Sequence, residues 1–156
     1  LEPKLIYRAF REDVPRGPYE TPLGEAALRR EGNDVSLFTW GAMTRPSLIA
    51  ADNLADEHGV DVEVVDLRTL SPLDRETITD SFRRTGRAVV VHEGPKTGGL
   101  GAEVAATLQE EALLYQEAPV KRIAGFDAPL PLHALEDYYL PQAVRIQEGV
   151  LETVAF

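Results

Sequence analysis

The sequence predicts a three-layer α/β/α fold with a mostly parallel sheet. Short apolar runs, typical of strands, alternate with longer segments in which apolar residues recur at helical spacing. One run, at 88–91, has no polar residue and is therefore typical of a central parallel strand that is buried on both faces. Strands that alternate with helices are joined by right-handed crossovers, which place helices on both sides of the sheet.

The first 33 residues differ from the rest of the chain. Leu5, Ile6, Tyr7 and Phe10 form a short apolar cluster, and a stretch rich in proline and glycine follows. Such a composition opposes a helix and favours an extended path. We therefore predict that residues 1–33 are a linker or arm and that residues 34–156 form the folded domain. The chain starts at a leucine without a signal-peptide pattern, so we expect it to be a piece of a longer protein, with the arm leading out of a missing N-terminal domain.

Strands and helices alternate regularly from residue 34. Strands are predicted at 35–40, 60–67, 87–92 and 120–124. Helices are predicted at 44–57, 74–85, 98–115 and from 141 onward, with a short helical or irregular piece at 133–139.

Residue types at the helix ends support these boundaries. Thr44 and Asp74 are types that cap helix N-termini, and Gly59 and Gly86 are natural C-terminal stops. The third helix should turn one apolar stripe inward, formed by Leu100, Val104, Leu108 and Ala112.

The composition narrows the function classes. The chain has 156 residues, 44% of them apolar, which suits one domain with a packed core. With 26 acidic and 16 basic residues the net charge is −10, so we expect no nucleic acid partner. The lack of cysteine excludes disulfides, thiolate metal ligands and cysteine nucleophiles, and it fits a cytoplasmic protein. No apolar run approaches the ~20 residues of a membrane helix, so we expect no membrane partner.

Two features near the third strand are candidates for chemistry. The glycine-rich turn 98–101 precedes a helix, as phosphate-binding loops do, but its spacing matches neither the dinucleotide fingerprint nor the P-loop. Tight strand-to-helix packing explains these glycines equally well. His92 and Glu93 lie at the carboxyl end of a central strand, where an acid–base pair is plausible. Adjacent strand residues point to opposite faces, however, so a structural histidine is the stronger interpretation.

Other polar residues give weaker signals. The acids of the second strand, Asp61, Glu63 and Asp66, have no nearby histidine that would complete a metal site, so we expect solvated or capping roles. His58 and His133 are isolated. The segment 66–74 reads as a rigid connector between strand and helix, with a subunit contact as the alternative.

Together these motifs resemble the beta subunit of the thiamine-diphosphate-dependent decarboxylase component of 2-oxo acid dehydrogenase complexes, of the pyruvate or branched-chain type. The similarity is carried by residues 66–74, 84–87, 90–95, 97–103 and 117–120. In the arm, Tyr7-Arg8, Val14-Pro15, Tyr19 and Pro22-Leu23-Gly24 resemble the junction that leads out of the pyrimidine-binding domain of that subunit.

The resemblance implies a transketolase-type C-terminal domain without its pyrimidine-binding half. In that family thiamine diphosphate and Mg²⁺ lie between the alpha subunit and the N-terminal domain of the beta subunit. The resemblance therefore implies no catalytic, cofactor-binding or metal-binding residue in this chain, and an isolated chain that is inactive. The parent reaction would be oxidative decarboxylation of a 2-oxo acid with acyl transfer to lipoamide.

The resemblance also implies a role in assembly. The expected partners are the alpha subunit, a second beta subunit and the subunit-binding module of the dihydrolipoyl acyltransferase. Glu117 matches a docking residue by motif position, and the terminal Phe156 with its carboxylate is the second candidate. Two alternatives stay open: another thiamine enzyme (acetoin dehydrogenase beta subunit, transketolase or deoxyxylulose phosphate synthase) and a free-standing nucleotide- or effector-binding domain.

Overall fold

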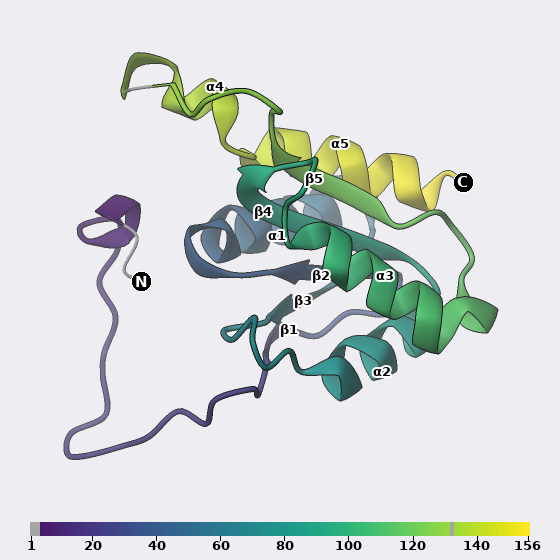
Figure 1. The fold of residues 1–156 in the computed structure, drawn as a ribbon, viewed down its shortest axis with the longest axis horizontal. Helices are drawn as coiled ribbons and strands as arrows, with labels where there is room; N and C mark the ends of the chain where they lie inside the picture. Colours follow the sequence, from purple (N-terminus) through teal and green to yellow (C-terminus); the bar gives the residue numbers. More distant parts are fainter. Residues whose placement is uncertain (1–3, 132) are drawn as a thin grey trace.

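A five-stranded sheet forms the centre of the molecule in the computed structural model, which describes residues 4–131 and 133–156 (Figure 1). The spatial order is β1-β3-β2-β4-β5. Strands β2 to β5 run parallel, and β1 runs antiparallel to β3. The strand bounds, from β1 to β5, are Ala27–Arg30, Val35–Thr39, Val62–Asp66, Ala88–Pro95 and Lys121–Gly125. The predicted α/β class with a mostly parallel sheet is therefore confirmed.

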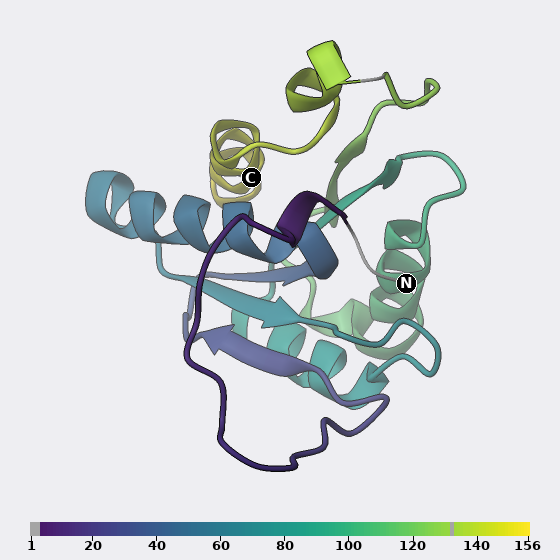
Figure 2. The same cartoon turned by 90° about the vertical axis from the view of Figure 1, so that its left-hand side faces the viewer.

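Helices cover both faces of this sheet (Figures 1 and 2). Helices α1 (Thr44–His58) and α5 (Ala143–Val154) pack together on one face, and α2 (Arg75–Thr85) and α3 (Gly101–Ala112) pack together on the other. Short helical turns complete the chain at Lys4–Ile6, Gly41–Met43, Leu113–Tyr115 and His133–Leu135, the last followed by α4 (Glu136–Tyr139). Within the described residues, no helix is both long and apolar enough to cross a membrane.

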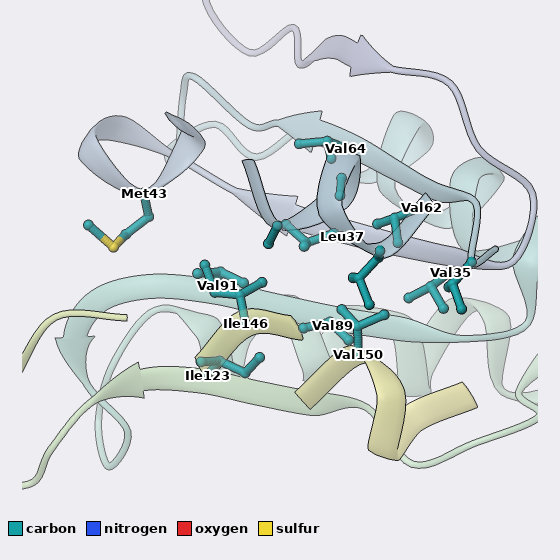
Figure 3. Close-up of a cluster of buried hydrophobic side chains, with 14 of the residues drawn as sticks. Val35, Leu37, Met43, Val62, Val64, Val89, Val91, Ile123, Ile146 and Val150 are labelled. Carbon is teal, nitrogen blue, oxygen red and sulfur yellow. The ribbon is translucent and has the colours of Figure 1, made fainter. Parts of the chain in front are cut away.

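Each face of the sheet has its own apolar core. On the α1/α5 face, side chains from four strands meet Ile146 and Val150 of α5 (Figure 3). On the α2/α3 face, Phe38 and Val90 pack against Ile78, Phe82 and residues of α3. Strand β4 is buried from Ala88 to His92, as its unbroken apolar run predicted, because helices lie on both of its sides.

Most helix ends lie where the sequence placed them. The Asp74 carboxylate accepts a hydrogen bond from the Thr77 backbone N–H at 3.0 Å, and Gly59 and Gly86 adopt left-handed φ values of 66°. Two expectations were wrong. Met43 rather than Thr44 is the N-cap of α1, without a side-chain cap. Leu100 is 53% exposed because it precedes α3, which begins at Gly101, so it is not part of the inward stripe.

Strand β1 is a correction to the predicted arm of residues 1–33. This segment, Ala27–Arg30, pairs with β3 and forms the antiparallel edge of the sheet. The sequence did not predict this strand, because Ala-Leu-Arg-Arg does not alternate apolar and polar residues and follows a proline- and glycine-rich stretch. Its strand conformation depends on the partner strand, and the folded unit therefore includes residues before position 34.

The part of the arm before residue 24 lies mostly in solvent (Figure 2). Leu5, Tyr7 and Phe10 are 48%, 60% and 46% exposed, while Ile6 packs against the α1/α5 core. The Arg45 guanidinium lies 5.9 Å from the centre of the Phe10 ring and donates a hydrogen bond to the Ala9 carbonyl. The apolar cluster of the arm is therefore poorly buried, apart from Ile6. Residues 1–3 of the arm lie outside the described residues.

Candidate functional site

The sheet has its topological switch point between the carboxyl ends of β2 and β4. The strand order reverses there, since β2 leads to β3 on one side and β4 leads to β5 on the other. Open parallel sheets bind their ligands at such a switch point. The loop at Trp40–Met43 follows β2, and the loop at 96–100 follows β4.

Two aromatic rings stack at the ends of these strands. The Trp40 and His92 rings stack with centroids 5.2 Å apart and planes 7° from parallel. His92 is only 2% exposed, and Trp40 packs against the α2/α3 core. Side chains of the protein itself therefore occupy part of this switch point.

The glycine loop packs directly on the His92 ring. A Cβ atom on Gly101 would lie 2.5 Å from the His92 Nε2 atom, and one on Gly99 would lie 2.7 Å from its Cε1 atom. Real Cβ atoms essentially never approach another atom so closely, so the ring leaves no room for a side chain at either position. Glycine is required here by close packing, which is the second of the two sequence interpretations.

The His92 imidazole is a buried neutral group. Burial lowers the pKa of His92, and the nearby Arg122 guanidinium lowers it further. Its Nε2 atom is buried and has no hydrogen-bond partner. Glu93 is exposed, as expected for adjacent residues of one strand, so the two side chains do not form an acid–base pair.

The loop above His92 is held in place by two contacts. Asp127 accepts hydrogen bonds from the Thr97 backbone N–H at 2.8 Å and from the Thr97 hydroxyl at 2.6 Å. The Thr97 hydroxyl, followed by the Thr97 backbone N–H, lowers the pKa of the Asp127 carboxyl. Arg122 donates to the Lys96 carbonyl at 2.8 Å. These bonds tie the β4–α3 loop to β5 and to the segment that follows it.

The acids near and on β3 have partners within the chain. Asp61 and Asp66 form ion pairs with Arg30 and Arg29, at 3.1 and 3.0 Å. Within the described residues, no group of three or more His, Asp or Glu side chains is arranged to hold a metal ion. His58 is exposed at the last turn of α1, and the side chain of His133 lies outside what the structure describes.

Glu63 contradicts the expectation of a solvated role, because it is only 3% exposed. Its carboxylate accepts a hydrogen bond from the Arg84 guanidinium at 2.7 Å and another from the Ser81 hydroxyl. The Ser81 hydroxyl also bonds the Ser36 hydroxyl at 2.7 Å, and that group bonds the Thr85 hydroxyl at 2.8 Å. This buried polar network between β2, β3 and α2 was missed, since no sequence spacing connects its members.

The two predicted docking residues lie at the opposite end of the sheet, where the parallel strands begin. Glu117 precedes β5 and Phe156 follows α5, and the Lys121–Glu152 ion pair joins these two elements at that end. Phe156 is 78% exposed. Glu117 forms a 2.5 Å ion pair with Arg87, and its backbone N–H donates to the Gly86 carbonyl at 2.8 Å.

An apolar patch lies next to Glu117. The helical turn Leu113–Tyr115 leaves Leu113, Leu114 and Tyr115 exposed by 54%, 96% and 52%. The sequence predicted one helix over 98–115, so this separate turn and its exposed side chains were not expected. Consecutive exposed apolar residues of this kind are typical of a protein contact.

Comparisons with known proteins agree on one family. The family described as "Transketolase, C-terminal domain" matches residues 24–146. The mitochondrial 2-oxoisovalerate dehydrogenase subunit beta of Dictyostelium discoideum is 46% identical over 157 residues, which cover 100% of this chain and 42% of that protein. The pyruvate dehydrogenase E1 component subunit beta of Staphylococcus aureus is 45% identical over 156 residues, covering 100% of this chain and 48% of that protein.

A solved structure agrees with these relatives. The split gene transketolase described as an inactive beta4 tetramer superposes with a TM-score of 0.78 at 32% identity, covering 92% of this chain and 46% of that one. The chain therefore spans less than half the length of the relatives it matches.

Proposed function

This chain belongs to the transketolase C-terminal domain family, and from that membership we propose that it is the assembly domain of the beta subunit of a 2-oxo acid dehydrogenase decarboxylase component. The complete enzyme would decarboxylate pyruvate or a branched-chain 2-oxo acid and transfer the acyl group to lipoamide. The support is the similarity to beta subunits of both kinds at 45–46% identity over the whole chain. The transketolase match at 32% identity is weaker, so another thiamine enzyme is not favoured.

The packing at the switch point is the structural observation that carries this proposal. Open parallel sheets bind their ligands at such a point. Here the stacked Trp40 and His92 rings and the adjoining glycines pack at the ends of β2 and β4. A domain whose own side chains pack at this point is suited to hold subunits together rather than to bind substrate there.

Thiamine diphosphate and Mg²⁺ belong, in our proposal, to the complete heterotetramer. Within the described residues, no group of three or more His, Asp or Glu side chains is arranged to hold the metal ion, which supports this part of the proposal. We propose that the alpha subunit and another domain of the beta subunit hold them.

The proposed partners are the alpha subunit, a second beta subunit and the subunit-binding module of the acyltransferase. Self-association is supported by the related transketolase, which is described as a beta4 tetramer. Acyltransferase docking is supported by the exposed patch beside Glu117, the exposed Phe156 and a net charge of −10, which would attract a basic module.

Two measurements on the purified chain test this function. With thiamine diphosphate, Mg²⁺ and pyruvate or 2-oxoisovalerate, we expect no decarboxylation above background. With a purified subunit-binding module of a dihydrolipoyl acyltransferase, we expect saturable binding by titration calorimetry. Turnover by the chain alone would contradict the assignment as an assembly domain, and the absence of binding would contradict the docking part of it.

A further inference from the structure

The segment 66–74, which links β3 to α2, has an unusual backbone. Arg68 has a φ of 52° and is the non-glycine residue with positive φ in the described part of the chain. Left-handed backbone is costly for a residue with a long side chain. The Arg68 backbone N–H donates to the Asp66 carboxylate at 3.1 Å, which supports the turn. This conformation aims the guanidinium across the end of the sheet, toward the residues that precede β1.

The guanidinium of Arg68 binds the backbone of those residues. Its Nε atom donates to the Glu25 carbonyl at 3.0 Å, and its Nη2 atom donates to the Ala26 carbonyl at 2.9 Å. Neither contact depends on the identity of the side chain at 25 or 26. Arg68 thus binds the main chain at residues 25 and 26 through two hydrogen bonds. The single ammonium group of a lysine would not make both bonds in this geometry.

The other end of the segment binds the same stretch of chain. The Asp74 carboxylate accepts a hydrogen bond from the Ala26 backbone N–H at 2.8 Å, in addition to capping α2. Pro72 lies against Gly24, where an added Cβ atom would come within 3.0 Å of the proline ring. Residues 24–26 are therefore held by both ends of segment 66–74, which lies more than 40 residues away in sequence.

The contacts with segment 66–74 add to those that hold strand β1 on the sheet, which include the ion pairs of Arg29 and Arg30. This strand has only four residues, its pairing with β3 is interrupted by a register shift, and Leu28 and Arg29 are exposed. Such a short edge strand is weakly held by its own hydrogen bonds. Without it, the buried strand β3 would become an open sheet edge, which is prone to pairing with other chains.

We propose that segment 66–74 is a clasp that binds residues 24–26, fixes the direction in which the preceding chain enters the domain, and holds β1 on the edge of the sheet. Arg68 is the positioning residue of this clasp. The inference goes beyond the assembly role and does not depend on which partner the domain binds. In this proposal segment 66–74 binds another part of the same chain, whereas the sequence suggested a rigid connector or a subunit contact.

Hydrogen–deuterium exchange on the full 156-residue chain tests the clasp. The decisive variant is Arg68→Asn, because asparagine tolerates the left-handed backbone but cannot reach the two carbonyls. Arg68→Lys keeps the charge and loses the fork of donors. Arg83→Asn is the matched control, since Arg83 is an exposed arginine of α2 whose partners, Asp80, the Glu111 carbonyl and the Tyr115 ring, are not in the clasp.

We expect the amides of residues 26–30 and those of β3 to exchange about tenfold faster in Arg68→Asn than in the unaltered chain, because two net hydrogen bonds are lost. Arg68→Lys should fall between the two, and Arg83→Asn should behave like the unaltered chain. Trypsin should cut after Arg29 or Arg30 faster in Arg68→Asn. Amides of α1 and β4 should stay protected in every variant.

Two results would overturn the proposal. One is exchange at residues 26–30 of Arg68→Asn within twofold of the unaltered chain, which would mean that the guanidinium does not hold the strand. The other is an equal loss of protection in α1, which would make Arg68 a residue of the whole fold rather than of the clasp.

Discussion

The residue with the most constrained surroundings is His92. Its ring stacks on Trp40 and packs against Gly99 and Gly101, and its Nε2 atom has no hydrogen-bond partner. Because burial lowers the pKa of His92 below the ordinary 6.5, the unfolded chain binds a proton more readily than the folded one. The stability that depends on neutral His92 is present above pH 6.5 and is lost as the pH falls from there toward the lower folded pKa. We expect the free energy of unfolding in urea to be smaller at pH 5.5 than at pH 7.5.

The variant His92→Phe isolates this contribution. It keeps a ring beside Trp40 and cannot be protonated, so the difference in stability between pH 7.5 and 5.5 should shrink. An unchanged pH dependence in His92→Phe would show that His92 titrates alike in the folded and unfolded chain.

Glu63 gives a second prediction at this scale. Its buried carboxylate accepts hydrogen bonds from Arg84 and Ser81, and hydrogen bonds to charged groups contribute about 1.5–3 kcal/mol. We expect Glu63→Gln, which keeps the shape and loses the charge, to lower the free energy of unfolding by about 1–3 kcal/mol in urea titrations. Glu76→Gln changes an exposed carboxylate of α2 and should lower the free energy of unfolding by no more than about 0.5 kcal/mol. Equal stabilities of the two variants would contradict the role assigned to the network.

Among elements, the β4–α3 connection shows most clearly how packing selects the sequence. Gly101 begins α3 beneath the His92 ring, and an alanine there would place its Cβ atom 2.5 Å from Nε2. The ring has little freedom to yield because Trp40 lies on it. We expect Gly101→Ala to destabilise the chain by about 1–3 kcal/mol, the usual range for overpacking, as measured by urea or thermal unfolding.

Gly94→Ala is the matched control for this substitution. It adds the same methyl group near the same ring, but at 3.4 Å from Nδ1, which is an ordinary contact. We expect Gly94→Ala to lower the free energy of unfolding much less than Gly101→Ala does. The double variant His92→Ser/Gly101→Ala should be more stable than the sum of its single changes predicts, because the ring that clashes is gone. If the destabilising effects of the two single changes simply added in the double variant, a contact other than that with the His92 ring would cause the destabilisation by Gly101→Ala.

The same connection marks the limit of what the sequence could predict. Apolar runs, Asp74 and the helix-ending glycines fixed most boundaries, since these signals act locally. A phosphate loop and a close-packed loop both require glycine, so only the position of the His92 ring decides between them. Strand β1 and the Glu63 network were missed for a related reason: each is defined by a partner distant in the chain.

On the scale of the whole molecule, the two ends of the sheet differ. The carboxyl ends of β2 and β4 carry the stacked Trp40 and His92 rings, and the start of the strands carries Glu117, the exposed turn 113–115 and Phe156. A protein contact that uses the second end leaves the first unaffected. The proposed docking of a basic acyltransferase module therefore predicts where substitutions act and where they do not.

Docking should weaken when Glu117 loses its charge or when the exposed Phe156 ring is removed. We expect Glu117→Gln, and separately the deletion of Phe156, to raise the Kd for the subunit-binding module about five- to tenfold, which corresponds to about 1–1.4 kcal/mol. Added salt should weaken binding of the unaltered chain more than that of Glu117→Gln, because one attractive charge has been lost. Titration calorimetry at two salt concentrations measures both effects.

Two controls separate docking from folding. Asp137→Asn removes an exposed charge at the carboxyl end and should leave the Kd unchanged. Arg87→Gln breaks the ion pair with Glu117 but leaves the carboxylate free for the partner, so binding should stay equal or become tighter. If Arg87→Gln instead weakened binding as much as Glu117→Gln does, Glu117 would act by holding Arg87 and the loop before β5. The docking surface would then have to be sought among the apolar residues of the turn 113–115.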